Sequence, residues 1–135
     1  MIPAGHDAVD GPGAAAILGM APSTFRNKRV AGRPDFPAPF KPGARKPLYD
    51  RAQVEAYRDG RQLPAVPFGH RHPDDLLDGP EAAELLGVEY GTLRHYVAEE
   101  RLAAVDVCGV PHYRRGDLDA RRANPGTPGP RPGRQ

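Results

Sequence analysis

The chain contains an internal repeat. A stretch of 21 residues from Val9 to Arg29 matches a second stretch from Leu77 to Val97 without a gap. Nine of the 21 positions are identical at a constant offset of 68 residues, and both copies contain the sequence Asp-Gly-Pro. A shorter match follows, in which residues 48–56 align with residues 112–120 at an offset of 64. Because internal repeats are copies of one structural unit, we expect two small units of the same fold.

Each long match has the pattern of two short helices joined by a tight turn. Gly11 and Gly79 are acceptable N-caps, and each is followed by a proline at the first helical position, where its missing N–H is tolerated. An apolar stripe with spacing i, i+3, i+4 follows in both copies. Gly19 and Gly87 are then expected to end this first helix in the left-handed conformation.

The second helix of each copy is expected to begin near Pro22 and near Tyr90, after a turn of about three residues. Phe25 and Leu93 occupy its inward position. Its outer side carries hydroxyl, amide and cationic groups, including Arg26 in the first copy. This pattern fits a helix-turn-helix, in which the second helix enters the major groove of DNA.

Short extended segments around a glycine follow the second helix. Apolar residues alternate with polar ones in residues 105–113, which predicts a two-stranded wing. Prolines in residues 36–49 favour an irregular wing in the first copy. A last short helix closes each unit, with Asp50 and Gln53 as a capping pair in the first copy and Leu118 as the apolar anchor in the second.

The expected fold class is therefore mainly α with small β-wings, arranged as two tandem winged helix-turn-helix domains. The first domain spans residues 8–61 and the second spans residues 76–123. Residues 62–75 are rich in proline and polar residues and are interpreted as a linker, long enough to place the units in major grooves about 34 Å apart. Residues 124–135 are interpreted as a disordered Pro/Gly tail.

The charge is distributed unevenly along the chain. The formal net charge is +2, but residues 1–67 carry ten basic and six acidic residues, which gives +4. Residues 68–124 carry seven basic and eleven acidic residues, which gives −4. The first half is therefore better suited to the phosphate backbone of DNA.

The remaining composition favours a cytoplasmic protein, associated with the bacterial nucleoid when it is bound to DNA. The single cysteine, Cys108, cannot form an internal disulfide, and no charged-then-apolar leader opens the chain. No apolar run approaches the about 20 residues that a membrane-spanning helix needs. The chain lacks a phosphate-binding loop, a zinc-finger pattern and a dinucleotide fingerprint. We therefore expect no enzyme activity, no cofactor and no metal, and we interpret the cluster His70-Arg71-His72 as part of a polar linker.

The motifs AAAILGMAPSTFR and AAELLGVEYGTLR, each followed by a glycine-containing wing and a short helix, resemble the winged helix-turn-helix family of MerR-type regulators and excisionases, including the small AlpA-like proteins. The resemblance implies that the second helix of each copy docks in the major groove and that the wing contacts the adjacent backbone or minor groove. The chain lacks the long dimerisation helix and effector domain of MerR regulators, so no small-molecule effector is expected.

The DNA-contacting side chains are expected on the second helices and around the wings. Arginine can bind guanine or phosphate through two hydrogen bonds, and asparagine can read adenine. Cations beyond the second helix are better suited to phosphate contacts. The candidate residues are Ser23, Thr24, Arg26, Asn27, Lys28, Arg29, Lys41, Arg45, Lys46, Thr92, Arg94, His95, Tyr96, Arg114 and Arg115.

These features predict sequence-specific binding to double-stranded DNA by a small transcriptional regulator or an excisionase-like factor. The direct sequence repeat predicts two neighbouring sites bound in a roughly head-to-tail sense. A recombinase or another copy of the chain on DNA is the further partner expected, and no membrane partner is expected. The alternative is a protein-interaction module, in which the acidic second unit, or both units, contacts a protein partner and no longer binds DNA.

Overall fold

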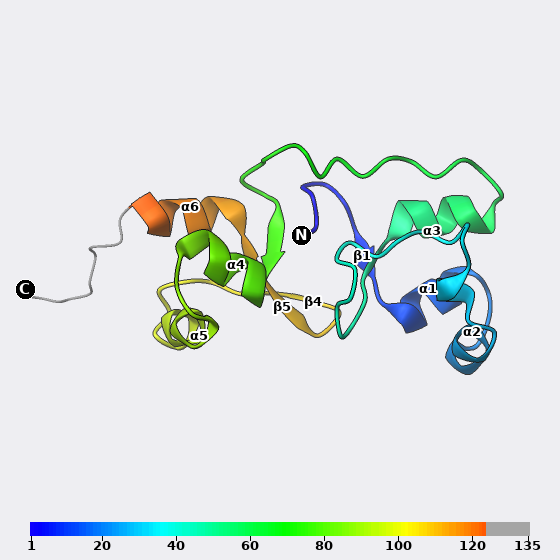
Figure 1. Cartoon of the computed structure of the whole chain (residues 1–135), viewed down its shortest axis with the longest axis horizontal. Helices are drawn as coiled ribbons and strands as arrows, with labels where there is room; N and C mark the ends of the chain where they lie inside the picture. Colours follow the sequence, from blue (N-terminus) through cyan, green and yellow to red (C-terminus); the bar gives the residue numbers. More distant parts are fainter. Residues whose placement is uncertain (124–135) are drawn as a thin grey trace, which may run out of the picture.

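The computed structural model describes residues 1–123, which form a mixed α/β protein with six α-helices and two small antiparallel sheets (Figure 1). The helices and sheets are divided between two parts of the chain that repeat one order of elements. We call residues 8–61 the first unit and residues 76–123 the second unit. Residues 124–135, for which a disordered tail was predicted, lie outside the described residues.

Both units begin with a short strand and two helices and end with a further strand and a third helix. The first unit consists of β1 (Ala8–Val9), α1 (Gly11–Ile17), α2 (Pro22–Asn27), the 3-10 helix η1 (Val30–Gly32), β2 (Tyr49–Asp50) and α3 (Arg51–Arg58). The second unit consists of β3 (Leu76–Asp78), α4 (Gly79–Leu86), α5 (Tyr90–Ala98), β4 (Val105–Val107), β5 (Val110–Arg114) and α6 (Arg115–Ala123). The three helices predicted for each copy are therefore present in both units.

The aspartate before each Gly-Pro caps the first helix of its unit. The Asp10 carboxylate accepts a hydrogen bond from the Gly13 N–H at 2.8 Å. Asp78 forms a full capping box, because its carboxylate accepts from the Glu81 N–H at 2.9 Å while the Glu81 carboxylate accepts from the Asp78 N–H at 3.0 Å. The expectation that the following glycines are the caps is wrong, because a carboxylate can satisfy a free N–H and glycine has no side chain to do so.

The predicted ends of these first helices are confirmed. Gly19 and Gly87 have φ angles of +74° and +69°, in the region that favours glycine. The residue after each glycine donates its N–H to a carbonyl of the preceding helix, from Met20 to Ala15 and from Val88 to Ala83, at 3.0 Å in both cases. In α3, by contrast, the predicted pairing of Asp50 with Gln53 is absent, since the Asp50 carboxylate lies 3.2 Å from His6 Nδ1 instead.

The strands confirm the wing predicted in the second unit. β4 and β5 are antiparallel, with Val107 opposite Val110, and β5 also pairs with β3, where Leu77 lies opposite Tyr113. We call residues 105–113 the second wing and residues 36–48 the first wing. The first wing forms no strand, as its prolines predicted, and the first unit instead pairs β1 with β2. The strands β1 and β3 were not predicted, because two or three residues are too few for alternation to be recognised.

Each unit has its own apolar core. In the first core the ring of Phe36 lies edge-on to Phe25, Tyr49 and Tyr57, with centroid distances of 5.7, 5.4 and 5.1 Å. Buried aliphatic side chains dominate the second core. Its buried members are Leu77, Ala82, Ala83, Leu93, Leu102, Tyr113 and Leu118. Both second helices are thus attached to the protein through one buried side chain, Phe25 in α2 and Leu93 in α5.

A third apolar cluster joins the two units. Its buried members are Ile2, Phe40 and Leu48, and Leu76 and Val107 of the second unit pack against them. Ile2 also pairs with β3, because its N–H donates to the Leu76 carbonyl at 2.8 Å and its carbonyl accepts from the Leu76 N–H at 2.9 Å. The segment before β1 therefore crosses from the first unit to the edge of the second.

The segment predicted as a linker, residues 62–75, is anchored at its C-terminal end. Asp75 is 1% exposed, and its carboxylate accepts hydrogen bonds from the Ala4 N–H at 2.8 Å, the His72 N–H at 2.9 Å and Arg115 Nε at 3.0 Å. Val66 packs against the third cluster. These contacts distinguish the segment from a free tether, because its end is held by the N-terminal segment through Ala4 and by α6 through Arg115.

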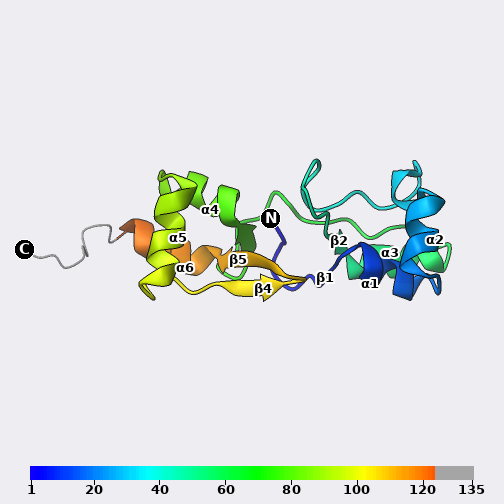
Figure 2. The same cartoon turned by 90° about the horizontal axis from the view of Figure 1, so that it is seen from below.

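The two units face each other across an approximate two-fold axis. The wings and strands lie at the centre of the molecule, whereas α2 and α5 lie at opposite ends on its lower side (Figure 1). The view from that side shows α2 and α5 both in front (Figure 2). Contacts are reciprocal: Lys41 of the first wing lies 2.7 Å from Asp78 of the second unit, and Cys108 Sγ of the second wing lies 3.8 Å from the Ala8 carbonyl oxygen of the first.

This arrangement differs from the head-to-tail order expected from the direct sequence repeat. A head-to-tail order would place each wing on the same side of its unit along the long axis of the molecule. Figure 1 instead shows both wings turned inward, so that one unit is rotated relative to the other. The physical reason is that each wing packs against the beginning of the opposite unit.

Two glycines in the second unit provide a matched test of the helix ends. Gly87→Ala should lower the free energy of unfolding by about 1 kcal/mol, because alanine resists a φ of +69°. Gly91→Ala should raise it by up to about 0.5 kcal/mol, since Gly91 is the second residue of α5 and a Cβ there would have nothing within 4 Å. Urea denaturation followed by circular dichroism measures both. A neutral Gly87→Ala would show that the left-handed helix end is not required.

The buried carboxylate of Asp75 predicts a pH-dependent stability. Burial opposes its ionisation, but hydrogen bonds from the His72 and Ala4 N–H groups and from Arg115 outweigh burial and lower the pKa. A lowered pKa stabilises the fold above about pH 4, the ordinary range for aspartate, and this stabilisation is lost as pH falls through the folded-state pKa.

Asp75→Asn should therefore lower the free energy of unfolding by about 1–3 kcal/mol at pH 7, and the difference from wild type should shrink below pH 4. Urea denaturation at pH 7 and pH 3 measures this difference. Asp74→Asn is the control, because the side chain of Asp74 is 54% exposed and should contribute little. A difference that is the same at both pH values would contradict the assignment of an ionised Asp75.

Candidate nucleic-acid interface

α2 is a short helix with one buried side and one solvent-exposed side. Phe25 is 7% exposed and holds the helix against the first core. Pro22 begins the helix, where its fixed φ suits the first helical position. The solvent side carries groups that can donate or accept hydrogen bonds, namely exposed Ser23, Arg26 and Asn27 with half-buried Thr24.

Two further cations follow directly after α2. Lys28 and Arg29 are both exposed. Arg29 has a φ of +50°, and this left-handed residue turns the chain toward the buried side chain of Val30. The conformation costs a non-glycine residue about 1 kcal/mol. The result is that Arg26, Lys28 and Arg29 present three positive charges within four positions.

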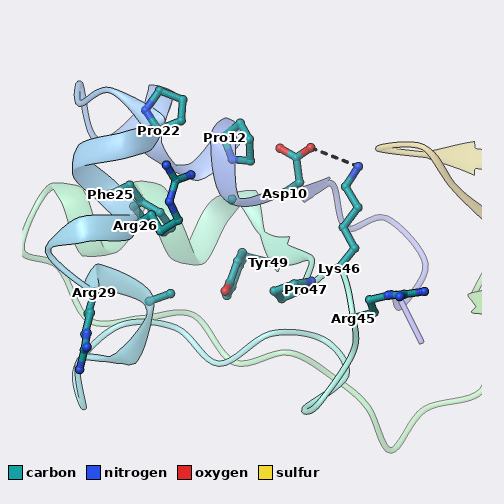
Figure 3. Close-up of a pocket in the computed structure, with 12 residues that line it drawn as sticks. Asp10, Pro12, Pro22, Phe25, Arg26, Arg29, Arg45, Lys46, Pro47 and Tyr49 are labelled. Atoms are coloured by element: carbon teal, nitrogen blue, oxygen red, sulfur yellow. Dashed lines mark ion pairs between the residues drawn. The ribbon is translucent and has the colours of Figure 1, made fainter.

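A hollow of about 400 Å³ lies between α2, the start of α1 and the first wing (Figure 3). Apolar side chains, including Phe25 and Tyr49, contribute to its lining. Its cationic members are Arg26, Arg29, Arg45 and Lys46. Of these, only Lys46 forms an ion pair within residues 1–123, with its Nζ 3.8 Å from the Asp10 carboxylate. An anion at this surface would therefore meet three guanidinium groups that no carboxylate of the described chain neutralises.

α5 displays related side chains at the other end of the molecule. Leu93 is fully buried and holds the helix against the second core, while Thr92, Arg94 and His95 are exposed. Thr92 and Arg94 occupy the positions of the threonine and arginine of α2 in the repeat. Arg94 forms no ion pair within residues 1–123, whereas His95 Nε2 lies 2.9 Å from a carboxylate oxygen of Glu99.

The charges around the two helices differ. Three exposed glutamates, Glu89, Glu99 and Glu100, flank α5. Cations flank α2, where Arg33 is exposed in addition to Lys28 and Arg29. Because like charges repel a polyanion and opposite charges attract it, α2 is the more favourable of the two for contact with phosphate.

Tyr96 does not belong to the exposed side of α5. It packs against the second core, and the guanidinium carbon of Arg121 lies 4.2 Å from the centre of its ring. This cation–π contact joins α5 to α6. The ring therefore has a structural role between α5, the second core and α6, and the DNA contact expected of Tyr96 stays a prediction.

Lys41 lies at the joint between the units. Its Nζ is 2.7 Å from a carboxylate oxygen of Asp78. Burial raises the pKa of Asp78, but hydrogen bonds from Lys41 and from the Glu81 N–H outweigh this effect and lower the pKa. Its charge thus faces the carboxylate that caps α4, and the phosphate contact expected of Lys41 stays a prediction.

Arg114 and Arg115 are also occupied within the protein. Arg115 is 13% exposed, and its Nε lies 3.0 Å from the buried carboxylate of Asp75. The guanidinium group of Arg114 contacts the carboxylate of Asp74. The phosphate contacts expected of both arginines stay predictions, and the Arg115–Asp75 pair holds the end of the 62–75 segment against α6.

Lys46 connects the two wings. Its Nζ donates a hydrogen bond to the carbonyl oxygen of Cys108, and its side chain remains 50% exposed. Burial and the negative charge of Asp10 raise the pKa of the Cys108 thiol. Lys46 thus has a structural contact and is still partly accessible to an anion.

Two exposed side chains next to these helices were not among the expected site residues. Tyr90 begins α5 and is 43% exposed, and its ring covers Gly79, where an added Cβ would lie 2.2 Å from a ring carbon. Gly79, which makes room for this ring, was the signal in the sequence that Tyr90 lies here, although Gly79 was interpreted from the sequence as a helix cap. Arg33 follows η1, and its signal was the concentration of basic residues from Arg26 onward.

Within residues 1–123, no helix is long and apolar enough to cross a membrane. In the same described part of the chain, no three His, Cys, Asp or Glu side chains form a group that could hold a metal ion. Comparisons with protein-family models, with curated proteins and with solved structures found nothing that matches the chain.

Proposed function

We propose that this protein binds double-stranded DNA sequence-specifically, with each unit acting as a winged helix-turn-helix and with α2 and α5 as its major-groove helices. The observation that carries the proposal is the placement of α2 and α5 on one side of the molecule (Figures 1 and 2). Both helices carry a Thr-x-Arg sequence there, Thr24 to Arg26 and Thr92 to Arg94, in which the arginine is exposed and the intervening residue is buried in the core.

The chemistry of the exposed side chains suits base edges. A guanidinium group can donate two parallel hydrogen bonds to O6 and N7 of guanine, and the Asn27 amide can pair with N6 and N7 of adenine. Arg26 and Arg94 form no ion pair within the described residues, so no internal carboxylate has to be displaced before they bind. Ser23 and Thr24 can add hydrogen bonds to phosphate or base.

The first wing supports phosphate binding next to α2. Arg45 is exposed and lies at the other end of the hollow from Arg29 in the close-up (Figure 3). Cations on both sides of a helix can bind the backbone on both sides of the groove that the helix enters. Phosphate contacts of this kind position the protein, while base contacts specify the sequence.

DNA binding of this kind serves either a small transcriptional regulator or an excisionase-like factor. The two roles differ in what they require of the DNA, because an excision factor must hold it bent whereas a regulator need only occupy it. A circular-permutation gel assay on a bound duplex distinguishes them: a strong dependence of mobility on site position assigns the excision role, and its absence assigns the regulator role.

A protein-interaction role for the second unit is the second candidate function. The observation that favours it is the group of exposed glutamates around α5, Glu89, Glu99 and Glu100, which opposes approach to phosphate. In that case α5 contributes nothing to DNA affinity, and Arg94→Ala binds DNA as tightly as the wild type. DNA recognition then rests on the first unit alone.

Arg26→Ala should weaken binding to a selected duplex by about 1–3 kcal/mol and relax selectivity at the base pair it contacts. Fluorescence anisotropy with the selected duplex and single-base variants of it measures both effects. Arg71→Ala is the matched control, because it removes the same charge from an exposed residue of the 62–75 segment, on the opposite side of the molecule from α2 and α5 (Figure 1). Equal losses for the two variants would show only a general charge effect.

Arg45→Ala should weaken binding to all duplexes about equally and should reduce the slope of log affinity against log salt by about 1, because it removes one phosphate contact. Lys41→Ala removes a cation from the same wing, but one that is already paired with Asp78. Its salt slope should therefore stay close to that of the wild type. Titrations at several salt concentrations give the slopes, and identical slopes for the two variants would contradict the assignment of Arg45.

A further inference from the structure

We propose that one chain reads two related half-sites in inverted orientation, so that its target is an imperfect palindrome although its sequence repeat is direct. This inference rests on the proposed function and adds the symmetry of the target to it. The half-site under α2 is called box 1, and the half-site under α5 is called box 2. The inference is carried by the rotation of one unit relative to the other.

A direct repeat in sequence specifies two copies of a fold but leaves their relative orientation open. The contacts between the units decide it here. The first wing reaches the second unit through the Lys41–Asp78 ion pair at 2.7 Å, and the second wing approaches the first unit where Cys108 Sγ lies 3.8 Å from the Ala8 carbonyl oxygen. Because each wing contacts the beginning of the opposite unit, the relation between the units is close to a two-fold rotation.

The axis of this rotation passes between the wings and points toward the side that carries α2 and α5 (Figure 1). Duplex DNA has local two-fold axes perpendicular to its helix axis, and a protein with a matching axis meets equivalent groups on the two strands. α2 and α5 therefore approach DNA in opposite senses along the duplex. Each helix reads its box in the direction along the duplex that its own unit faces. Because the two units face opposite directions, the two boxes are inverted relative to each other.

The two boxes should be related but not identical. The repeat places Thr24 with Thr92 and Arg26 with Arg94, so these positions read the same base types. The next position differs, since Asn27 in α2 corresponds to His95 in α5. His95 Nε2 lies 2.9 Å from a carboxylate oxygen of Glu99. The target is therefore palindromic at the base pairs read by the Thr and Arg positions, and asymmetric at the base pairs read by Asn27 and His95.

The spacing between the boxes should be fixed. Ile2 is hydrogen-bonded in both directions to Leu76 at 2.8 and 2.9 Å, and it is 2% exposed within the third cluster. Phe40 and Leu48 of the first unit are buried in the same cluster. A cluster of this kind restricts rotation and separation of the units, unlike a flexible linker, which would tolerate many spacings.

The wings meet above the centre of such a target. Both reach down to the side of α2 and α5 at the middle of the molecule (Figure 1). Lys46 connects them through its hydrogen bond to the Cys108 carbonyl, and Arg45 beside it is exposed. The central base pairs therefore lie under Arg45 and Lys46 and are bound through their backbone, with no requirement for one sequence.

The first step of the test is selection of binding sites by the full chain from a pool of duplexes with a random region of about 40 base pairs, long enough for two boxes one or two helical turns apart. We expect two boxes in inverted orientation at one spacing. Two boxes in direct orientation would overturn the inference and leave the proposed DNA binding intact. A single enriched box would also overturn the inference while leaving the proposed DNA binding intact, and it would support the interaction role of the second unit.

The second step compares three synthetic duplexes built from the selected boxes: the selected inverted arrangement, the same boxes with box 2 reversed, and the inverted arrangement with five added base pairs, about half a helical turn. The second and third duplexes should bind at least about tenfold more weakly than the first. In both of them α5 no longer meets its box, so the chain loses the affinity that a linked second site adds. Equal affinity for the inverted and direct duplexes would overturn the inference.

Arg94→Ala is the diagnostic variant and Arg71→Ala is its control. Arg94→Ala should bind the inverted and direct duplexes equally, because it no longer reads box 2, whereas Arg71→Ala should keep the wild-type preference. A preference that survives in Arg94→Ala would overturn the assignment of box 2 to α5. Failure of the proposed function looks different: the pool is not enriched in any sequence, and binding does not fall as salt rises.

Discussion

The third apolar cluster, in which Ile2, Phe40 and Leu48 are buried, is the contact on which the arrangement of this molecule depends. Units of about 50 residues bury only a small core, so each gains from burying further apolar surface against the other. The same contact holds the first wing against the second unit and the segment before β1 against β3. Without it, the positions of α2 and α5 relative to each other would not be set.

The contact also determines which cations remain available to a ligand. Lys41, Arg114 and Arg115 are paired with Asp78, Asp74 and Asp75 where the units, the 62–75 segment and α6 meet. Arg115 and Asp75 require such pairing, because they are largely buried and an unpaired charge there would lose its hydration without compensation, whereas Arg114 and Asp74 pair at the exposed surface. Among the cations expected to contact DNA, Arg26, Lys28 and Arg29 on and beside α2, Arg45 in the first wing and Arg94 in α5 are exposed and form no ion pair within the described residues.

The two helices are similar in their exposed sequence but different in their surroundings. α2 is followed by cations and lies beside the hollow rimmed by Arg45 and Lys46, whereas α5 is flanked by glutamates. Under the proposed function, a polyanion is therefore attracted mainly to the first unit, and the second unit adds side chains suited to discriminating sequence. On this view the first unit contributes most of the affinity, and the rotation of the second decides which arrangement of half-sites it meets.

Local sequence patterns determined the elements of each unit. The apolar stripes, the glycines at 19 and 87 and the alternation in residues 105–113 act over a few neighbouring residues, so the helices, their ends and the second wing could be predicted. The exposed sides of α2 and α5 followed from the same periodicity, with Phe25 and Leu93 directed inward. Tyr96 shows the limit, because only its packing against the second core and Arg121 places it.

Tertiary structure decided the rotation of the units and the partners of the wing cations. These features depend on contacts between residues far apart in the chain, such as Ile2 with Leu76 and Lys41 with Asp78. A repeat encodes the same local fold twice, but it carries no information about how the copies pack. That relation is set by which apolar surfaces become buried together, and burial is a property of the folded chain as a whole.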